Sequence, residues 1–409
     1  MIFEVDLGST DYIEEHDAVI VGGGAAGLRS AISLAERGIS PIILTKTTVD
    51  ECATAWAQGG LAAVEPPDSF ESHAQDTLKA GHYCDPLMVR EMVQQAPAVI
   101  DELRSWGMPF SPVLHREGGH AVARVYNTGD GATGAAMHAV LLTRAKKMGI
   151  KITEHFRAVD ILTNGTAACG IRVQDENGRI GELLTNIVVL ATGGIGRIFG
   201  RTTNPVTATG DGLAMAIRAG ARTKNMRYVQ FHPTVLDSPS GVLISEAVRG
   251  AGAVIELFDG TTIPLAPRDI VSAAIWKAGG HAILNCEKVD WTQFPAIARQ
   301  LEGYDLDRIP IAPSAHYHCG GVVANIDGST SIDGLYAVGE VACTGLHGSN
   351  RLASNSLTEA VTMGRLVATG LNKNHEYTKP TPRARVMENL DACNLRLVKE
   401  AVGQQPWML

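Results

Sequence analysis

The sequence predicts an α/β protein in which a parallel sheet with its helices is interrupted by a second, smaller unit. Two observations carry this prediction. Near the start, a short apolar strand leads directly into a glycine-rich turn and a helix, and the same texture returns near residue 331 after a long stretch of different character. The length agrees, because 409 residues are too many for one ordinary compact core. We therefore expect two domains, one of them discontinuous in the sequence.

Composition excludes several classes of protein. Hydrophobic residues make up 45% and charged residues 19% of the chain, which excludes a disordered protein. A net charge of −8 makes nucleic acid and anionic membrane poor partners. No run approaches the roughly 18 apolar residues of a membrane helix, and the first residues lack the features of a secretory signal. Seven scattered cysteines without a C-x-x-C pair indicate reduced thiols, so we expect a cytoplasmic enzyme.

The first element is a strand over 17–21, since its apolar, β-branched residues are typical of a buried parallel strand. The turn 22–27 follows, then a helix over 28–37 that ends at Gly38, and a second strand over 40–44. Together they form a βαβ unit of about 28 residues.

The later elements follow from the same kinds of pattern. The turn Glu176–Gly178 predicts an antiparallel hairpin, and the apolar run Ile332–Val338 predicts a buried strand. We expect helices over 85–107, 134–147, 356–369 and 384–402, strands over 151–154, 158–163, 169–174 and 182–190, and a polar linker over 373–382.

The change of texture sets the expected domain boundaries. We assign 1–234 to the first part of the nucleotide-binding domain, 235–309 to an inserted α+β domain, 310–372 to the second part, and 373–409 to a linker and a last helix.

The turn at 22–27 reads Gly-Gly-Gly-Ala-Ala-Gly and is the central chemical signal. In this fingerprint Gly22 permits the tight turn, Gly24 lets a pyrophosphate approach, and Gly27 lets the helix pack on the strand. The flanking strand and helix favour dinucleotide binding over an ordinary glycine-rich turn.

The acidic residue expected about 20 positions later for an NAD ribose is missing. The second strand ends instead at Leu44-Thr45-Lys46, and a lysine is a poor partner for a ribose diol. This disfavours a simple NAD dehydrogenase and leaves FAD open. Lys46 is either a cofactor contact or a solvated charge.

Three histidines and two arginines stand in unusual contexts. His232, His316 and His347 lack the spacing of a zinc site, so we expect no metal, and a packed or capping role is the alternative for each. Arg268 begins a predicted helix, where a cation is disfavoured, and Arg351 stands among small residues. A misplaced arginine suggests an anionic ligand, because guanidinium binds carboxylates bidentately, although a structural ion pair remains the alternative.

Five segments resemble the flavoprotein family of succinate dehydrogenase, fumarate reductase and L-aspartate oxidase. They are the turn at 22–27, AQGG at 57–60, QFHPT at 230–234, APSAHYHCGG at 312–321, and GLYAVGEVACTGLHGSNRLASNSL at 334–357. The resemblance extends from about residue 15 to 372. It implies a Rossmann-like FAD-binding domain with an inserted α+β capping domain.

Two positions discriminate within that family. The segment Arg116-Glu117-Gly-Gly-His120, followed by Arg124, resembles the L-aspartate oxidase branch. Glu117 has a physical reason there, because aspartate differs from succinate by an ammonium that a carboxylate can pair with; a surface glutamate is the alternative. Ala53 stands where succinate dehydrogenases carry the histidine that bonds to the flavin, so we expect non-covalent FAD.

The resemblance also implies roles for single residues. Arg268 matches the catalytic arginine, which exchanges protons with the substrate. The expected substrate-binding residues are Glu117, His232, Ser245, Glu246, His316 and Arg351. The expected FAD-binding residues are Gly22, Gly24, Ala25, Ala26, Gly27, Lys46, Thr54, Gln58, Gly59, Gly60, Thr192, Gly193, Asp211, Glu340, Asn355, Ser356 and Leu357.

The implied reaction is the FAD-dependent oxidation of L-aspartate to iminoaspartate, with O2 or fumarate as the final electron acceptor. Iminoaspartate would feed quinolinate synthase in NAD biosynthesis, which makes that enzyme a candidate partner. Two alternatives stay open: a soluble fumarate reductase or succinate dehydrogenase, and a non-catalytic FAD-binding scaffold.

The chain departs from the family in three places. Only about a dozen residues connect the 246–253 stretch to Leu265, which predicts a shortened cap. Ser245 replaces the usual threonine and Ala251 the usual glutamate. By the resemblance, we also expect the family's helical domain after residue 384 to be largely missing. The shortened cap is expected to affect affinity and turnover rather than the chemistry.

Overall fold

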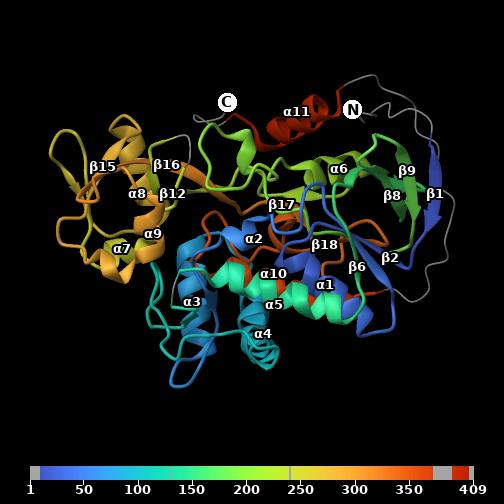
Figure 1. Cartoon of the computed structure of the whole chain (residues 1–409), viewed down its shortest axis with the longest axis horizontal. Coiled ribbons are helices and arrows are strands. Elements are labelled where there is room, and N and C mark those ends of the chain that lie inside the picture. The colour runs from blue at the N-terminus through green and yellow to red at the C-terminus, as the bar shows by residue number, and fades with distance from the viewer. Residues whose placement is uncertain (1–9, 130, 239–240, 372–388, 405–409) are drawn as a thin grey trace.

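The computed structural model describes residues 10–129, 131–238, 241–371 and 389–404. At its centre lies a five-stranded sheet in which all neighbouring strands are parallel (Figure 1). All four side chains of its middle strand are buried, as expected when both faces of a parallel sheet are covered. From edge to edge the strands are β18 (Leu335–Ala337), β10 (Val188–Leu190), β2 (Ala18–Val21), β3 (Pro41–Leu44) and β6 (Lys151–Thr153).

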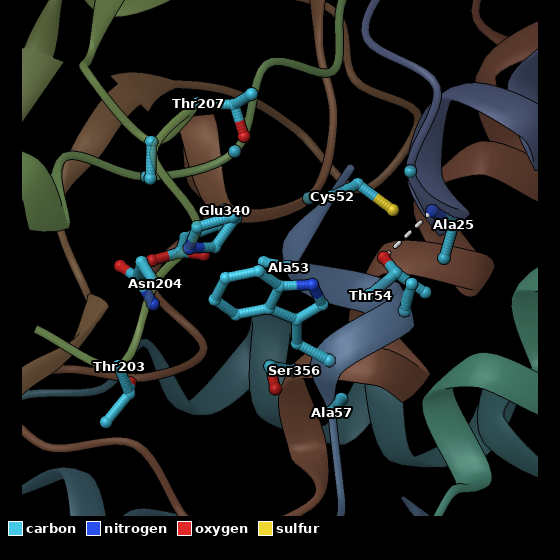
Figure 2. Close-up of a pocket in the computed structure, with 18 of the residues that line it drawn as sticks. Ala25, Cys52, Ala53, Thr54, Ala57, Thr203, Asn204, Thr207, Glu340 and Ser356 are labelled. Atoms are coloured by element: carbon cyan, nitrogen blue, oxygen red, sulfur yellow. Dashed lines mark hydrogen bonds between the residues drawn. The ribbon is translucent and has the colours of Figure 1, made fainter. Parts of the chain in front are cut away.

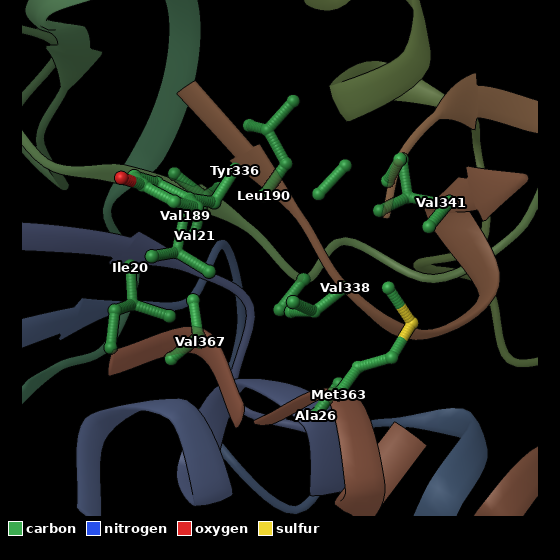
Figure 3. Close-up of a cluster of buried hydrophobic side chains, with 14 of the residues drawn as sticks. Ile20, Val21, Ala26, Val189, Leu190, Tyr336, Val338, Val341, Met363 and Val367 are labelled. Atoms are coloured by element: carbon green, nitrogen blue, oxygen red, sulfur yellow. The ribbon is translucent and has the colours of Figure 1, made fainter. Parts of the chain in front are cut away.

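Helices α1 (Ala25–Ala35), α5 (Thr133–Lys147) and α10 (Asn355–Leu366) lie together against this sheet (Figure 1). Figure 3 shows the apolar contact between the strands and these helices, with side chains such as Ile20 and Val189 above Ala26 and Met363. Gly364 lets α10 pack closely on α1, because a β-carbon there would lie 2.8 Å from the Ala26 carbonyl oxygen. The predicted βαβ unit is confirmed, although α1 begins at Ala25 rather than at residue 28.

Two further helices and several short elements complete this part of the chain. Helix α4 (Pro86–Ser105) matches the predicted helix over 85–107 and packs on α3 (Phe70–Gly81), which was not predicted. The other short elements are α2 (Ala53–Trp56), α6 (Asp211–Ala219), β4 (Leu61–Ala62), β5 (Val125–Tyr126), β11 (Thr223–Lys224), β17 (Gly321–Val323), β19 (Ala342–Cys343), and 3-10 turns at Gly196–Ile198, Gly339–Val341 and Val367–Thr369. A further 3-10 turn, Trp291–Gln293, packs against a separate hydrophobic cluster at the other end of the molecule.

A second sheet confirms the predicted hairpin and corrects one predicted strand. Its strands, in order, are β1 (Tyr12–Glu15), β9 (Ile180–Leu184), β8 (Ala168–Gln174) and β7 (Arg157–Thr163), with β8 and β9 antiparallel. The single strand expected over 182–190 is wrong, because its residues divide between β9 and β10 in different sheets. Thr185 turns the chain between them: its hydroxyl accepts from the Ile187 N–H at 3.1 Å and donates to the Asp17 carbonyl at 3.0 Å.

A separate hydrophobic cluster lies at the other end of the molecule, drawn yellow to orange in Figure 1. It forms on a five-stranded antiparallel sheet and beside three helices. The strands, in order, are β12 (Val229–Leu236), β16 (Arg308–His318), β15 (Ala282–Asn285), β13 (Val254–Glu256) and β14 (Thr262–Ile263), and the helices are α7 (Glu246–Gly250), α8 (Arg268–Lys277) and α9 (Pro295–Gln300). The expected boundaries near 235 and 309 fall inside β12 and β16, so the domain division stays a prediction.

The last described helix is α11 (Leu390–Val402), which packs on α6. The expected linker over 373–382 and the first residues of the helix expected over 384–402 lie outside the described residues. The helix expected over 356–369 is confirmed as α10 followed by a 3-10 turn. Among the described helices, none combines the length and the apolar character that crossing a bilayer requires.

The close packing at Gly27 gives a first test. A β-carbon there would lie 1.9 Å from the Gly22 carbonyl oxygen, so Gly27→Ala must push the helix off the turn. We expect the melting temperature to fall by about 5 °C or more. Gly250→Ala is the control, because a β-carbon at Gly250 meets nothing within 4 Å. Equal melting of both variants, measured by thermal unfolding, would contradict this account of the turn.

Candidate functional site

A cavity of about 720 Å³ lies between the parallel sheet and the antiparallel sheet. Its size is in the usual range for a cofactor or small-ligand site. Figure 2 shows Ala25 and Thr54 on one side of it, with Thr203, Asn204 and Thr207 on the opposite side. Segments far apart in the sequence therefore form its wall.

The glycine turn forms one end of the cavity. Gly22 has a φ of +114°, and a β-carbon on it would lie 2.2 Å from the Ala191 carbonyl oxygen, so the fold requires glycine here. Gly24 lines the cavity where α1 begins, and the positive end of that helix favours a negatively charged group. The Thr54 hydroxyl accepts from the Ala25 N–H at 3.1 Å and fixes α2 beside this end (Figure 2).

Lys46 is ion-paired at the cavity wall and is not a solvated charge. Its Nζ lies 2.8 Å from a carboxylate oxygen of Asp211 and 2.6 Å from the Thr209 hydroxyl. Burial alone would raise the pKa of Asp211, but Lys46, with Arg157 behind it, lowers that pKa below its usual range. Asn394 of α11 donates to the other Asp211 oxygen at 2.9 Å. The carboxylate therefore stays charged and held from three sides.

Glu340 is a buried carboxyl on the same wall (Figure 2). It accepts from the backbone N–H of His318 at 2.9 Å, and a β-carbon on Gly194 would lie 2.2 Å from its Oε1. Burial raises the pKa of Glu340 to about 7, so a hydroxyl-rich ligand could share a proton with it near neutral pH.

Several buried polar atoms of the cavity wall have no hydrogen-bond partner among the described residues. Among the described residues, the Thr192 hydroxyl, the Gln58 carbonyl oxygen and Arg351 Nε are buried without a hydrogen bond. All three residues line the cavity. Buried polar groups are normally satisfied, so these atoms indicate a polar ligand. The glycine turn, the helix end and these unpaired atoms together fit FAD.

The other end of the cavity carries an ion pair. Arg268, the first residue of α8, lies 3.2 Å through Nε from Glu246 Oε1, and its Nη1 donates to the Gln230 side chain at 3.0 Å. Burial would raise the pKa of Glu246, but the charge and hydrogen bond of Arg268, together with its other neighbours, including Arg249, outweigh burial and hold that pKa at about 2. Ser245 caps α7, its hydroxyl accepting from the Ala247 N–H at 3.3 Å.

His232 and His316 come together from β12 and β16, with ring centroids 5.2 Å apart. Each lies beside an irregularity in the pairing of these strands: the register shifts after His232, and it shifts opposite His316, which has no direct partner. Such bulges re-aim side chains beside functional sites. Burial, helped by the charge of Arg268, lowers the pKa of His232 to about 3, and burial lowers that of His316 well below its ordinary value. Both rings are therefore neutral near pH 7.

Arg351 also lines this end of the cavity. Its Nη1 donates to the Ser356 hydroxyl at 2.5 Å, and its guanidinium lies 4.7 Å from the centre of the Tyr317 ring. Burial lowers the pKa of Arg351, with the Arg268 charge adding to the effect. An anion bound between these two arginines would offset both the desolvation of Arg351 and the repulsion between the two guanidinium groups.

Glu117 faces the same end from a different segment. Its Oε2 accepts from the Ser354 hydroxyl at 2.5 Å, and a β-carbon on the adjoining Gly118 would lie 2.9 Å from Glu246 Oε2. One cavity end therefore carries two arginines, two neutral histidines and two carboxylates.

The structure gathers nearly all the predicted site residues in this one cavity. Two do not line it: Gly27 packs beneath the turn, and the Asn355 side chain binds His73 at 2.9 Å and Thr77 at 3.0 Å. His347 also lies outside the lining and binds Glu359 at 2.8 Å. The role of each predicted residue stays a prediction.

Other lining residues were missed by sequence reasoning: Trp56, Arg157, Arg197, Thr203, Asn204, Thr207 and Tyr317. Tyr317 had a usable signal, because it stands between two histidines in a quoted motif. The others carry no local signal. Within the described residues, no His, Cys, Asp and Glu side chains are grouped in a way that could hold a metal ion.

Comparison with known proteins agrees with this geometry. The model of the FAD binding domain family matches residues 17–357. L-aspartate oxidase 1 of Ralstonia nicotianae is 43% identical, over 90% of this chain and 76% of that protein. L-aspartate oxidase of Streptomyces coelicolor is 39% identical, over 90% of this chain and 70% of its own. The solved quinol fumarate reductase of E. coli has a TM-score of 0.82 at 32% identity, covering 87% of this chain and 70% of that one.

Buried histidines predict how stability depends on pH. His73, His232 and His318 have pKa values of about 4, 3 and 4, against an ordinary 6.5, chiefly because they are buried. The unfolded chain therefore binds more protons between about pH 4 and 6.5, and stability falls as pH drops through that window. Glu340, raised to about 7, opposes this with a single proton.

We expect the melting temperature to fall steadily from pH 6.5 to 4.5. His318→Gln keeps a donor toward the Met226 carbonyl, which the His318 ring contacts at 3.0 Å, but cannot take up a proton. In this variant the melting temperature should therefore fall less steeply. The corresponding slope of the free energy of unfolding should be shallower by up to ~1.4 kcal/mol per pH unit. Thermal unfolding across the pH range measures both slopes, and identical slopes would contradict the assignment.

Proposed function

The chain belongs to the L-aspartate oxidase family of FAD-binding flavoproteins, and from this premise we propose that its cavity oxidises L-aspartate to iminoaspartate. One observation carries the proposal: a carboxylate, Glu117, faces the same cavity end as two arginines and two neutral histidines. That set matches a molecule with two carboxylates and one ammonium. FAD, when bound, supplies the two-electron acceptor for this oxidation.

Arg351, His232 and His316 bind the two substrate carboxylates in this proposal. Arg351 offers charge and a free buried N–H, since its Nε has no partner among the described residues. The His232 Nδ1 faces the Thr234 N–H at 3.4 Å, which leaves the proton on Nε2. A neutral imidazole then donates a hydrogen bond without adding a third positive charge.

Arg268 is the proposed proton-exchanging residue. Glu246 and Gln230 hold its guanidinium on three nitrogens, so its direction is fixed before substrate arrives. Such preorganised positioning supplies much of the rate enhancement of enzymes. Glu246 stays ionised beside it, because its pKa is about 2, and keeps the pair neutral overall.

Glu117 distinguishes the proposed substrate from plain dicarboxylates. A carboxylate in a buried site attracts an ammonium and disfavours a ligand that leaves it unpaired. A fumarate reductase or succinate dehydrogenase activity is the second candidate, favoured by the fold and by the two arginines. Glu117, and Ala53 in place of a flavin-linking histidine, count against it.

We also propose O2 or fumarate as the final electron acceptor, a cytoplasmic location, and delivery of iminoaspartate to quinolinate synthase. These rest on the family alone.

The direct test is anaerobic mixing of the FAD-loaded protein with L-aspartate and, separately, with succinate. We expect L-aspartate to bleach the flavin absorbance and succinate to leave it unchanged. Bleaching by succinate alone would favour the second candidate. No bleaching by either would contradict both.

Glu117→Gln tests the ammonium contact. Losing the charge should lower kcat/KM for L-aspartate by about 100-fold, while inhibition by succinate is kept or strengthened. The neutral amide keeps the shape and can still meet the Ser354 hydroxyl. If steady-state assays showed kcat/KM for L-aspartate and inhibition by succinate weakened equally, Glu117 would not be the residue that binds the ammonium.

A further inference from the structure

Glu117 stands on a segment, 116–124, that has little regular structure of its own. Two glycines follow it directly, and Gly119 has a φ of +90°, so the local support is one short turn, in which the His120 N–H donates to the Glu117 carbonyl at 3.2 Å and Arg116 donates to the His120 carbonyl at 2.9 Å. Contacts from outside the segment add to this support. The structure shows two such contacts at the far end of the segment.

The first contact is made by Arg124, which is fully buried. Its guanidinium binds both Asp68 oxygens at 2.8 and 3.1 Å, Asp76 at 2.5 Å, and the Ser72 hydroxyl at 2.7 Å. Asp76 also accepts from the backbone N–H of Ala121 at 2.7 Å. Arg124 and Asp76 therefore fasten the segment to α3 and the turn before it.

His120 makes the second contact. Its Nδ1 accepts from Arg124 Nη1 at 3.2 Å, so its Nε2 carries the proton and donates to the Ala353 carbonyl at 2.9 Å. Burial lowers the pKa of His120, and the Arg124 charge lowers it further, while the charges of Glu117 and Asp76 act to raise it. The net lowering favours the neutral ring that this hydrogen-bond pattern needs.

Ala353 precedes the residue that holds Glu117. Ser354 has a φ of +63°, accepts from the Gly60 N–H at 3.2 Å and donates to Glu117 at 2.5 Å. His120 and Ser354 thus tie both ends of residues 117–120 to one short stretch at the start of α10. This double attachment sets the position of the Glu117 carboxylate in the cavity wall.

We propose that His120 and Arg124 are positioning residues that hold the Glu117 carboxylate at the cavity and so set its preference for an amino dicarboxylate over the same dicarboxylate without the amine. The inference rests on the proposed function. Neither side chain lines the cavity, so both act through Glu117 rather than on the substrate.

The test is a double-mutant cycle on the FAD-loaded protein. His120→Ala should lower kcat/KM for L-aspartate about 10- to 100-fold and change the succinate inhibition constant by less than about 2-fold. In a Glu117→Gln background, where no ammonium contact remains, His120→Ala should have almost no further effect on the ratio of the two constants. His120→Gln, whose amide can donate to Ala353, should restore part of the loss.

Arg124→Met is compared with Arg29→Met as its matched control. Arg29 is also a buried arginine that binds a carboxylate bidentately, Glu102 at 2.8 and 2.7 Å, but it lies between α1 and α4. Both variants should lose stability. Only Arg124→Met should change the ratio of kcat/KM for L-aspartate to the succinate inhibition constant. Flavin content and melting temperature are measured for every variant.

Two results would overturn the inference: equal losses for both ligands in His120→Ala, or an undiminished His120→Ala effect in the Glu117→Gln background. If Arg124→Met does not fold, the His120 variants decide the matter. Failure of the proposed function is separate, because it appears in the unmodified protein as no response to L-aspartate.

Discussion

The pairing of β12 with β16 is the constraint on which the rest of the structure depends. These two strands run from the parallel-sheet core into the second hydrophobic cluster, and each carries site residues along the way. A regular ladder would direct His232 and His316 by simple alternation. The register shifts beside both residues break that alternation and bring the two rings within 5.2 Å of each other. The cavity lies where the paired strands β12 and β16 pass from one hydrophobic core to the other.

In the proposed function, the charges at this cavity end match a ligand with two carboxylates and one ammonium. Arg351 is buried and Arg268 is partly buried, and each lowers the pKa of the histidines near it. Glu246 offsets Arg268, and Tyr317 lies beneath Arg351, so neither guanidinium is left alone in a low dielectric. The pKa values of both histidines are lowered, so the rings stay neutral. In the proposed function they donate hydrogen bonds to the substrate carboxylates, which meet two guanidinium groups that neighbouring groups already stabilise.

Sequence patterns predicted the local parts of the fold well. The strand, turn and helix around 17–44 follow from short-range sterics, since apolar β-branched residues and glycines specify this geometry almost alone. The error over 182–190 has the opposite origin. That run is mostly apolar, and its polar pair Thr185-Asn186 stands where the chain leaves one sheet for the other. The Thr185 hydroxyl donates there to the carbonyl of Asp17, which is 168 positions away in the sequence. The helix α3 was missed because its buried face is mostly small or polar, His73 and Thr77 included.

The amino-acid sequence is enough to predict a dinucleotide-binding turn and the residue types that could recognise a dicarboxylate. Glycines, misplaced arginines and the Glu117 segment are chemical facts of the chain, readable without a fold. Tertiary structure alone decided which of them meet. It turned Lys46 into the partner of Asp211, moved Asn355 and His347 out of the cavity lining, and placed Glu117 through Ser354, 237 residues away. Such contacts depend on strand register and on the direction of buried side chains, which are properties of the packed whole and not of any local segment.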